Sequence, residues 1–127
     1  MPSGLLAEYG LTTDAGQRQS YRCDDSTARL VSIRDILAPM GRGLNEDVVR
    51  QLLSGIKSAV SIPPVIVVPE GFKQQVALLD GLHRFRVSLA LGYPIVPCQY
   101  ISLERAKDVY GHWPRLSQAE ESPPGDD

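Results

Sequence analysis

Two apolar runs joined by a short turn, and followed at once by a helical pattern, constrain the fold of this chain most strongly. The first run, PVIVV at 64–68, has almost no polar face, and the second, QQVALLD at 74–80, follows the turn PEGFK at 69–73. Short apolar runs bounded by Pro and Gly are typical of strands joined as an antiparallel hairpin. We therefore predict a hairpin here, with 64–68 as a central strand because neither of its faces suits water.

Helical patterns flank the hairpin on both sides. Before it, apolar residues recur at three- and four-residue steps over 46–58, which predicts an amphipathic helix capped by Asn45. After it, a helix over 83–91 ends before Gly92, a residue that suits the position after a helix C-cap. The remaining predicted elements are a strand at 28–33, a helical turn at 34–37, a strand at 95–101 and a helix from 103 capped by Ser102. This order predicts a small mixed α/β (α+β) domain, with a mixed sheet of about four strands and helices packed on it.

The two ends of the chain lack such patterns. Residues 1–25 mix Gly, Thr, Ser, Gln and Asp without periodicity, so we expect an irregular N-terminal segment. Residues 114–127 are acidic and rich in Pro and Gly, and they cannot bury enough apolar area to offset their ordering entropy. We therefore expect a disordered tail there and a single folded domain at 26–113.

Composition argues against several kinds of site. The chain has 127 residues and a formal net charge of -2, whereas a duplex-binding domain of this size usually has a large basic surplus. Any DNA contact is therefore expected through a partner or an oligomer. Cys23 and Cys98 lack CxxC or zinc-like spacing, so we predict no metal site and favour free thiols over a disulfide. No membrane span or signal peptide is recognised, which favours a cytoplasmic protein without a membrane partner.

The second apolar run ends in a corner with an unusual composition, Asp80-Gly81-Leu82-His83-Arg84-Phe85-Arg86, hereafter the corner. Gly81 has no side chain to obstruct a ligand. The first N–H groups of the following helix have no intrahelical partner and carry partial positive charge, which attracts an anion. His83 and Arg84 lie in that first turn, where the helix dipole disfavours cations, so their presence indicates a bound phosphate.

A plainer interpretation of the corner is also open. Arg86 shares a helix face with His83, and both arginines can lie on a solvated surface. Asp80 can then cap the helix and pair with one of them. Composition and spacing alone do not decide between a phosphate site and a solvated helix face.

The sequence around the corner resembles a known superfamily. From about Val31 to Ile101 the chain resembles the ParB/sulfiredoxin superfamily, in particular the N-terminal ParB-like (ParB-like nuclease) domain. The resemblance rests on the helix NEDVVRQLLSGIKS, the strand PPVIVV, the strand ALLDG and the closing segment ALGYPIVPCQYI. GLHRFRV is similar to the GERRxRA motif of ParB proteins and to the GCHR motif of sulfiredoxins.

This resemblance implies a domain that binds a nucleotide, ATP or CTP, with or without Mg²⁺. The phosphate-binding residues that it implies are Asp80, Gly81, Leu82, His83, Arg84 and Arg86. Leu82 stands where sulfiredoxins have a nucleophilic cysteine, so sulfinic acid reduction is not expected. ParB proteins have a Glu at that position and a later Asn-containing nucleotide motif, for which only Glu104 is a candidate here. They also continue into a helix-turn-helix domain, so we do not expect this chain alone to read a DNA sequence.

Two alternative functions remain open. Free-serine kinases of the same fold place a catalytic carboxylate near the start of the first long helix, where Glu46 and Asp47 lie in this sequence. One of them would be the general base of a small ATP- or ADP-dependent phosphotransferase or of a nucleotide hydrolase. Acids in a first helical turn are also ordinary complements of the helix dipole. The other alternative is a non-catalytic regulator that associates with DNA through a partner; no paired carboxylates support a nuclease.

Overall fold

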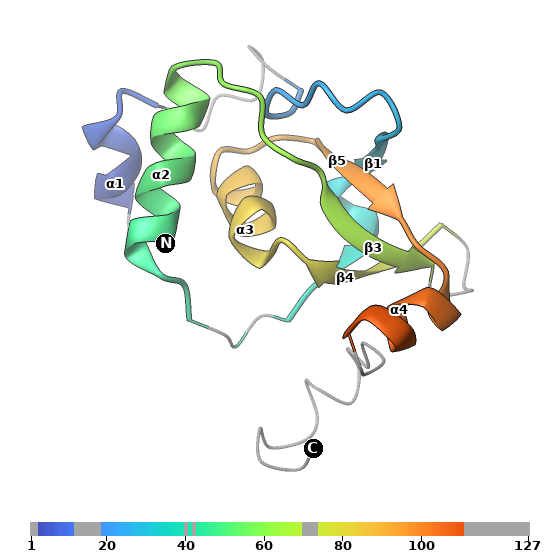
Figure 1. Ribbon diagram of the computed structural model, residues 1–127. Coiled ribbons are helices and arrows are strands. Elements are labelled where there is room, and N and C mark those ends of the chain that lie inside the picture. The colour runs from blue at the N-terminus through green and yellow to red at the C-terminus, as the bar shows by residue number, and fades with distance from the viewer. Residues whose placement is uncertain (1–2, 12–18, 40, 42, 70–73, 111–127) are drawn as a thin grey trace.

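The computed structural model describes residues 3–11, 19–39, 41, 43–69 and 74–110, and Figure 1 shows how their elements are arranged. A five-stranded mixed sheet has the strand order β1-β5-β3-β4-β2. The strands are β1 (Arg29–Ser32), β2 (Ile36–Leu37), β3 (Val65–Pro69), β4 (Val76–Asp80) and β5 (Ile95–Tyr100). The helices are α1 (Ser3–Glu8), the 3-10 helix η1 (Ile33–Asp35), α2 (Glu46–Lys57), α3 (Leu82–Ala90) and α4 (Leu103–Tyr110). The mixed α/β class predicted from the sequence is confirmed.

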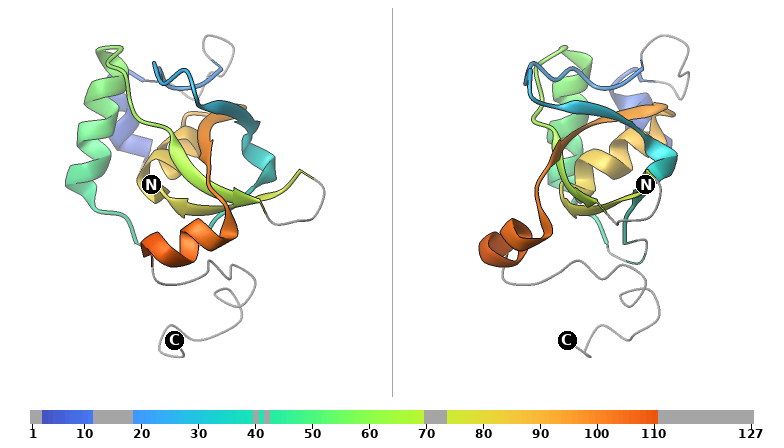
Figure 2. Two further views of the ribbon diagram at one scale, coloured as in Figure 1. Left: turned by 45° about the vertical axis from the view of Figure 1, so that its right-hand side comes forward. Right: turned by 90° about the vertical axis from the view of Figure 1, so that its right-hand side faces the viewer.

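The sheet is curled, and the chain connectivity explains why. Strands β1 and β2 lie at opposite edges of the sheet, yet only the three residues of η1 separate them in sequence. The edges of a flat five-stranded sheet would be roughly 19 Å apart, whereas three residues of 3-10 helix advance by about 6 Å. The sheet must therefore bend until its two edges approach each other, as Figure 2 shows.

Strand β2 corrects two predictions. The pattern predicts a helical turn at 34–37 and about four strands, but the turn ends at Asp35 and a fifth strand follows it. Ile36 and Leu37 pair in parallel with the start of β4. Ile36 is buried, and its β-branched side chain suits a strand better than a helix. The two-residue strand is too short for an alternating pattern to reveal it.

The predicted hairpin is confirmed. Strands β3 and β4 pair antiparallel, and β5 lies parallel to β3 on its other side, so β3 is the central strand. Val65, Val67 and Val68 have no exposed surface. Strand β5 in turn pairs antiparallel with β1. The hairpin therefore begins with the central strand β3, and its second strand, β4, ends at the corner from which α3 starts.

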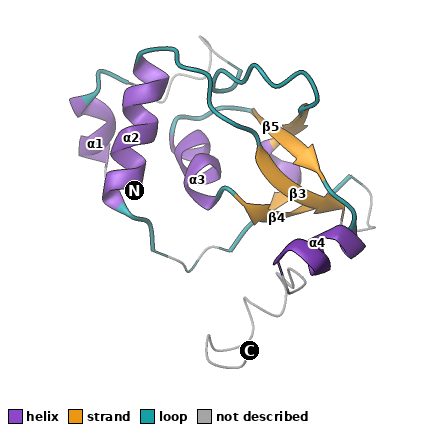
Figure 3. Cartoon of the chain, viewed as in Figure 1, coloured by secondary structure: helices purple, strands orange, loops and turns teal. Residues whose placement is uncertain are grey.

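Helices α1, α2 and α3 lie together on one side of the molecule, and α4 lies beside β3 on another, as Figure 3 shows. Helix α3 contacts both α2 and β3. Its end is as predicted, because Gly92 has a φ of 76° and its N–H donates to the carbonyl of Leu89 at 3.1 Å. Among the residues that the structure describes, none of the helices has the length and apolar character needed to cross a bilayer.

The N-terminal segment differs from the expectation of irregular structure over 1–25. Ser3–Glu8 form α1, and Leu5 and Leu6 are buried in the core. Tyr21 is buried as well, so residues before 26 contribute to the folded unit. The acidic tail at 114–127 lies outside the described residues, and the domain boundaries stay a prediction.

Candidate anion-binding site

Gly81 determines the geometry of the corner between β4 and α3. It is the N-cap of α3 and has a φ of 104°, which residues with a side chain rarely adopt. A Cβ atom at this position would lie 2.8 Å from Cγ1 of Val65 and 3.2 Å from Nη2 of Arg84. Glycine is therefore required both by the backbone conformation and by the close approach of these two side chains.

The first turn of α3 has no side-chain cap. The helix makes its first backbone hydrogen bond from the N–H of Phe85 to the carbonyl of Gly81, at 2.9 Å. The N–H groups of Leu82, His83 and Arg84 therefore precede the intrahelical bonds. Each of these three residues is partly exposed. The positive end of the helix dipole is available to an anion there.

Arg84 is held in place by backbone carbonyls. Its Nη1 donates to the carbonyl oxygen of Pro63 at 3.2 Å and to that of Pro64 at 2.9 Å. Its Nη2 lies on the side of Gly81, close to the uncapped turn. Within the described part of the chain, neither Nη2 nor Nε has an acceptor. The carbonyl bonds therefore orient one edge of the guanidinium and leave its other donors for a ligand.

Arg86 has an unsatisfied buried atom. Its Nη1 is buried and has no hydrogen-bond partner among the described residues. Leaving a buried charged donor unsatisfied costs about 1–3 kcal/mol or more, so such an atom needs an explanation. The plainer interpretation, with Asp80 capping α3 and pairing with an arginine, is not what the described residues show: Asp80 is exposed, caps nothing and makes no ion pair.

His83 connects the corner to the start of α2. Its Nε2 accepts a hydrogen bond from the backbone N–H of Asn45 at 2.9 Å. Because Nε2 accepts this bond, the ring proton lies on Nδ1 in this arrangement. The N-termini of α2 and α3 therefore lie on either side of one imidazole ring, and both helices begin on the same side of the molecule (Figure 1).

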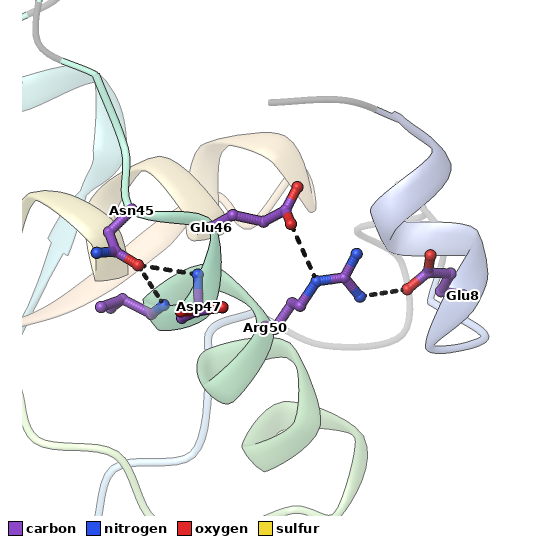
Figure 4. A network of polar contacts seen from close by, with 6 residues as sticks. Glu8, Asn45, Glu46, Asp47 and Arg50 are labelled. Atoms are coloured by element: carbon purple, nitrogen blue, oxygen red, sulfur yellow. Dashed lines mark hydrogen bonds and ion pairs between the residues drawn. The ribbon is translucent and has the colours of Figure 1, made fainter.

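Glu46 and Asp47 lie at the first turn of α2, and the Glu46 side chain is bonded to an arginine of its own helix. Glu46 accepts a hydrogen bond from Nε of Arg50 at 3.4 Å, and Nη1 of Arg50 also contacts Glu8 of α1. Figure 4 shows Glu46 pointing toward Arg50 and α1, away from the Asn45 side chain. The hydrogen bond with Glu8 is the main cause of the raised pKa of Arg50. The exposed Asp47 makes no side-chain bond with any described residue, and the general-base role stays a prediction.

The cysteines supply no reactive thiol at the corner. Leu82 occupies the position of the sulfiredoxin cysteine. Cys98 is buried on β5, where its thiol contacts the carbonyl of Val96 at 3.4 Å, and burial raises the pKa of Cys98 to about 12. The thiol is therefore neutral near pH 7 and is a poor nucleophile. Cys23 is partly exposed and free. The described residues also contain no group of three or more side chains placed to hold a metal ion.

The residues that hold Arg84 were not found by sequence reasoning. The hydroxyl of Tyr21 donates to the carbonyl oxygen of Pro63 at 2.7 Å, and the same oxygen accepts the bond from Arg84. Burial raises the pKa of Tyr21, while the charge of Arg84 acts in the opposite direction. The signal in the sequence is the pair Pro63-Pro64, which interrupts regular secondary structure between α2 and β3, so that carbonyls there can bond to side chains.

Residues 81–84 of the corner are partly exposed. One shallow hollow of about 580 Å³ is found elsewhere, lined by residues 19–23 together with Leu30 and Pro97, among others, and by no residue of α3. A ligand at the corner would therefore be held by charge and by amide groups.

Comparison with solved structures supports the fold predicted from the resemblance. The chain is similar to sulfiredoxin from Arabidopsis thaliana, with 19% sequence identity and a TM-score of 0.52, over 64% of this chain and 93% of sulfiredoxin. It is also similar to a conserved hypothetical protein from Pyrococcus furiosus, with 13% identity and a TM-score of 0.53. That match covers 64% of this chain and 34% of the other, so this chain spans about a third of that protein. The fold is therefore sulfiredoxin-like.

A more distant match is to the chromosome-partitioning protein ParB from Caulobacter crescentus, complexed with CTP-gamma-S. It has 19% identity and a TM-score of 0.49, and it covers 65% of this chain and 53% of the ParB chain. The functional argument does not use this ParB match. The matches to sulfiredoxin and to the Pyrococcus furiosus protein establish the fold alone. No family model and no curated protein matches the chain.

Proposed function

We propose that this domain binds the phosphates of a nucleotide, ATP or CTP, at the corner formed by residues 80–86. The observation that carries the proposal is the buried and unsatisfied Nη1 of Arg86, on a helix whose first turn is uncapped. Within the described residues, Nη1 of Arg86 has no acceptor and the first turn of α3 has no side-chain cap. Nucleotide phosphates would supply both negative charge and acceptor oxygens.

Each element of the corner has a distinct part in this proposal. The phosphate oxygens accept from the first N–H groups of α3 and from Nη2 or Nε of Arg84, and their charge compensates Arg86. The neutral His83 keeps a proton on Nδ1 and can donate it while Nε2 stays bonded to Asn45. Any Mg²⁺ would arrive with the nucleotide, because phosphates and water commonly supply most ligands of this ion.

The test replaces Arg86 by methionine, which keeps an unbranched apolar stem and removes the charge. We expect Arg86→Met to raise the melting temperature of the ligand-free protein, since a buried unsatisfied group is removed. We expect it also to abolish the stabilisation that ATP, CTP or pyrophosphate gives the wild type. Arg105→Met, on the exposed face of α4, is the matched control and should bind as the wild type does.

Two results would contradict the proposal. One is a wild type that none of the four ribonucleoside triphosphates or pyrophosphate stabilises, with or without Mg²⁺. The other is an Arg86→Met variant that binds as tightly as the wild type. The phosphotransferase and hydrolase alternatives have less support, because Glu46 is bonded to Arg50 and points toward α1. No observation on the described residues favours direct contact with DNA.

A further inference from the structure

Residues 19–24, hereafter the strap, bind along the loop that joins α2 to β3. The N–H of Ile62 donates to the carbonyl of Arg22 at 2.8 Å, and the N–H of Asp24 donates to Oγ of Ser61 at 2.9 Å. The strap thus follows the loop over several consecutive positions. The last two residues of this loop are the prolines whose carbonyls hold Arg84, so the strap lies next to the support of the corner.

Tyr21 is the strap residue that reaches this support. Only 2% of its surface is exposed, and its hydroxyl donates to the carbonyl oxygen of Pro63 at 2.7 Å. A carbonyl oxygen has two lone pairs, and the second one here receives Nη1 of Arg84. The oxygen of Pro63 is therefore shared between one buried hydroxyl and one guanidinium.

Sharing this oxygen restricts the guanidinium before any ligand arrives. The proline rings fix the backbone φ angles of Pro63 and Pro64, and the bond from Tyr21 restricts the direction of the Pro63 carbonyl. Arg84, bonded to Pro63 and to Pro64, can then present Nη2 to the uncapped turn in only a narrow range of orientations. An arginine loses much rotamer freedom when it binds a ligand, and fixing it in advance removes that loss from the binding step.

We propose that Tyr21 is a positioning residue for Arg84, acting through the carbonyl of Pro63. Its consequence for affinity rests on the proposed function, because it assumes that Arg84 contacts a nucleotide phosphate. The positioning itself exists in the ligand-free protein and is measurable there. It makes residues 19–24, which the sequence suggested to be irregular, a part of the binding site.

The first experiment measures nucleotide affinity by calorimetry for Tyr21→Phe, which keeps the buried ring and removes the hydroxyl. The dissociation constant should rise by about threefold to tenfold, as expected for one lost hydrogen bond that orients a charged donor. In an Arg84→Lys background, Tyr21→Phe should have no further effect on affinity, because lysine cannot reproduce the planar pair of bonds to the two carbonyls. This double-mutant cycle separates positioning from general loss of stability.

Two control variants test specificity. Ser61→Ala removes the bond from Asp24 and loosens the strap without touching Pro63, and Tyr100→Phe removes a hydroxyl from a tyrosine on β5. Both should leave the dissociation constant unchanged. If Ser61→Ala weakens binding as much as Tyr21→Phe does, strap stability is responsible and the positioning role is wrong.

The second experiment needs no ligand. Nitrogen-15 NMR of the arginine side chains reports how freely the Arg84 guanidinium rotates, and Tyr21→Phe should speed that rotation while Tyr100→Phe leaves it alone. If Tyr21→Phe changes neither this rotation nor the affinity, the positioning role is overturned and nucleotide binding stands. If the wild type binds no nucleotide but Tyr21→Phe frees Arg84, the proposed function fails and the positioning role stands.

Discussion

The N-termini of α2 and α3 flank the same imidazole ring, yet they are built in opposite ways. At α2, the side chain of Asn45 accepts from the N–H groups of Asp47 at 2.9 Å and Val48 at 3.2 Å, and the first turn carries two acids. At α3, the N-cap is Gly81, no side chain caps the turn, and the first turn contains no acidic residue. The first turn of α2 has a side-chain cap and acids within the protein, whereas the first turn of α3 has neither.

Under the proposed function, this difference in capping and charge distinguishes a helix N-terminus that binds a ligand from one that serves the fold. The N-terminus of α2 is a suitable control for that of α3, because the two lie next to each other. The N–H of Asn45, at the start of α2, donates to His83 in the first turn of α3. Substitutions at the two termini should therefore have separable effects. Those at α2 should change stability, and those at α3 should change binding of nucleotide phosphates.

The largest effect is expected for Gly81→Ala. The new Cβ would lie 2.8 Å from Val65, and a φ of 104° is strained for alanine, so the variant should lose about 1–3 kcal/mol of stability. Displacement of Arg84 from the uncapped turn should also abolish nucleotide binding. Urea denaturation and calorimetry measure the two effects. Gly43→Ala is the matched control, since a Cβ there meets nothing within 4 Å. Binding by Gly81→Ala at wild-type affinity would refute the role of this corner.

Arg84→Lys is expected to have the next largest effect. Lysine keeps the charge but cannot bond two carbonyls and a phosphate with one planar group, so affinity should fall by about tenfold to a hundredfold. Stability should fall by about 1 kcal/mol as the carbonyls of Pro63 and Pro64 lose their bonds from Arg84. Calorimetry checks the affinity, with Arg34→Lys on the exposed surface of η1 as the control. An unchanged affinity would mean that Arg84 is only a structural brace.

Asn45→Ala tests the other side of the comparison. Removing this cap should cost about 1 kcal/mol of stability, because two N–H groups of α2 lose their acceptor. The backbone N–H that donates to His83 is retained, so nucleotide affinity should not change. Urea denaturation and calorimetry are again the measurements. If Asn45→Ala lowers the nucleotide affinity as well as the free energy of unfolding, the α2 terminus is part of the binding site.

The local features of this comparison could be read from the sequence, because caps and helix starts depend on adjacent residues. Asn45 and Gly92 were assigned correctly, and the hairpin leading to Gly81 was predicted in its observed pairing. The contacts that support the corner could not be read in this way. Tyr21 and Pro63 are 42 positions apart, and Asn45 and His83 are 38 apart, so only the folded chain brings them together.

Strand β2 was missed for a related reason. Its two residues form a strand only because the sheet curls and brings them beside β4. Without that partner, the local pattern over 34–37 is equally compatible with a helical turn, and the 3-10 helix η1 does occupy its first half. The number of strands is thus a property of the closed sheet and cannot be obtained from a local window of sequence.

Glu46→Gln should have the smallest effect, and for that reason it separates a binding domain from an enzyme. Glu46 is exposed and its contact with Arg50 is a surface ion pair, so its loss should shift the melting temperature by less than about 2 °C. Nucleotide affinity should be unchanged, because the side chain is bonded to Arg50 and points toward α1. Phosphate release, measured with each triphosphate, should be as low in this variant as in the wild type. Turnover by the wild type that Glu46→Gln eliminates, with affinity retained, would instead establish a general base at the start of α2. In that case the N-terminus of α2 would carry the catalytic group, and the N-terminus of α3 would only bind the nucleotide phosphates.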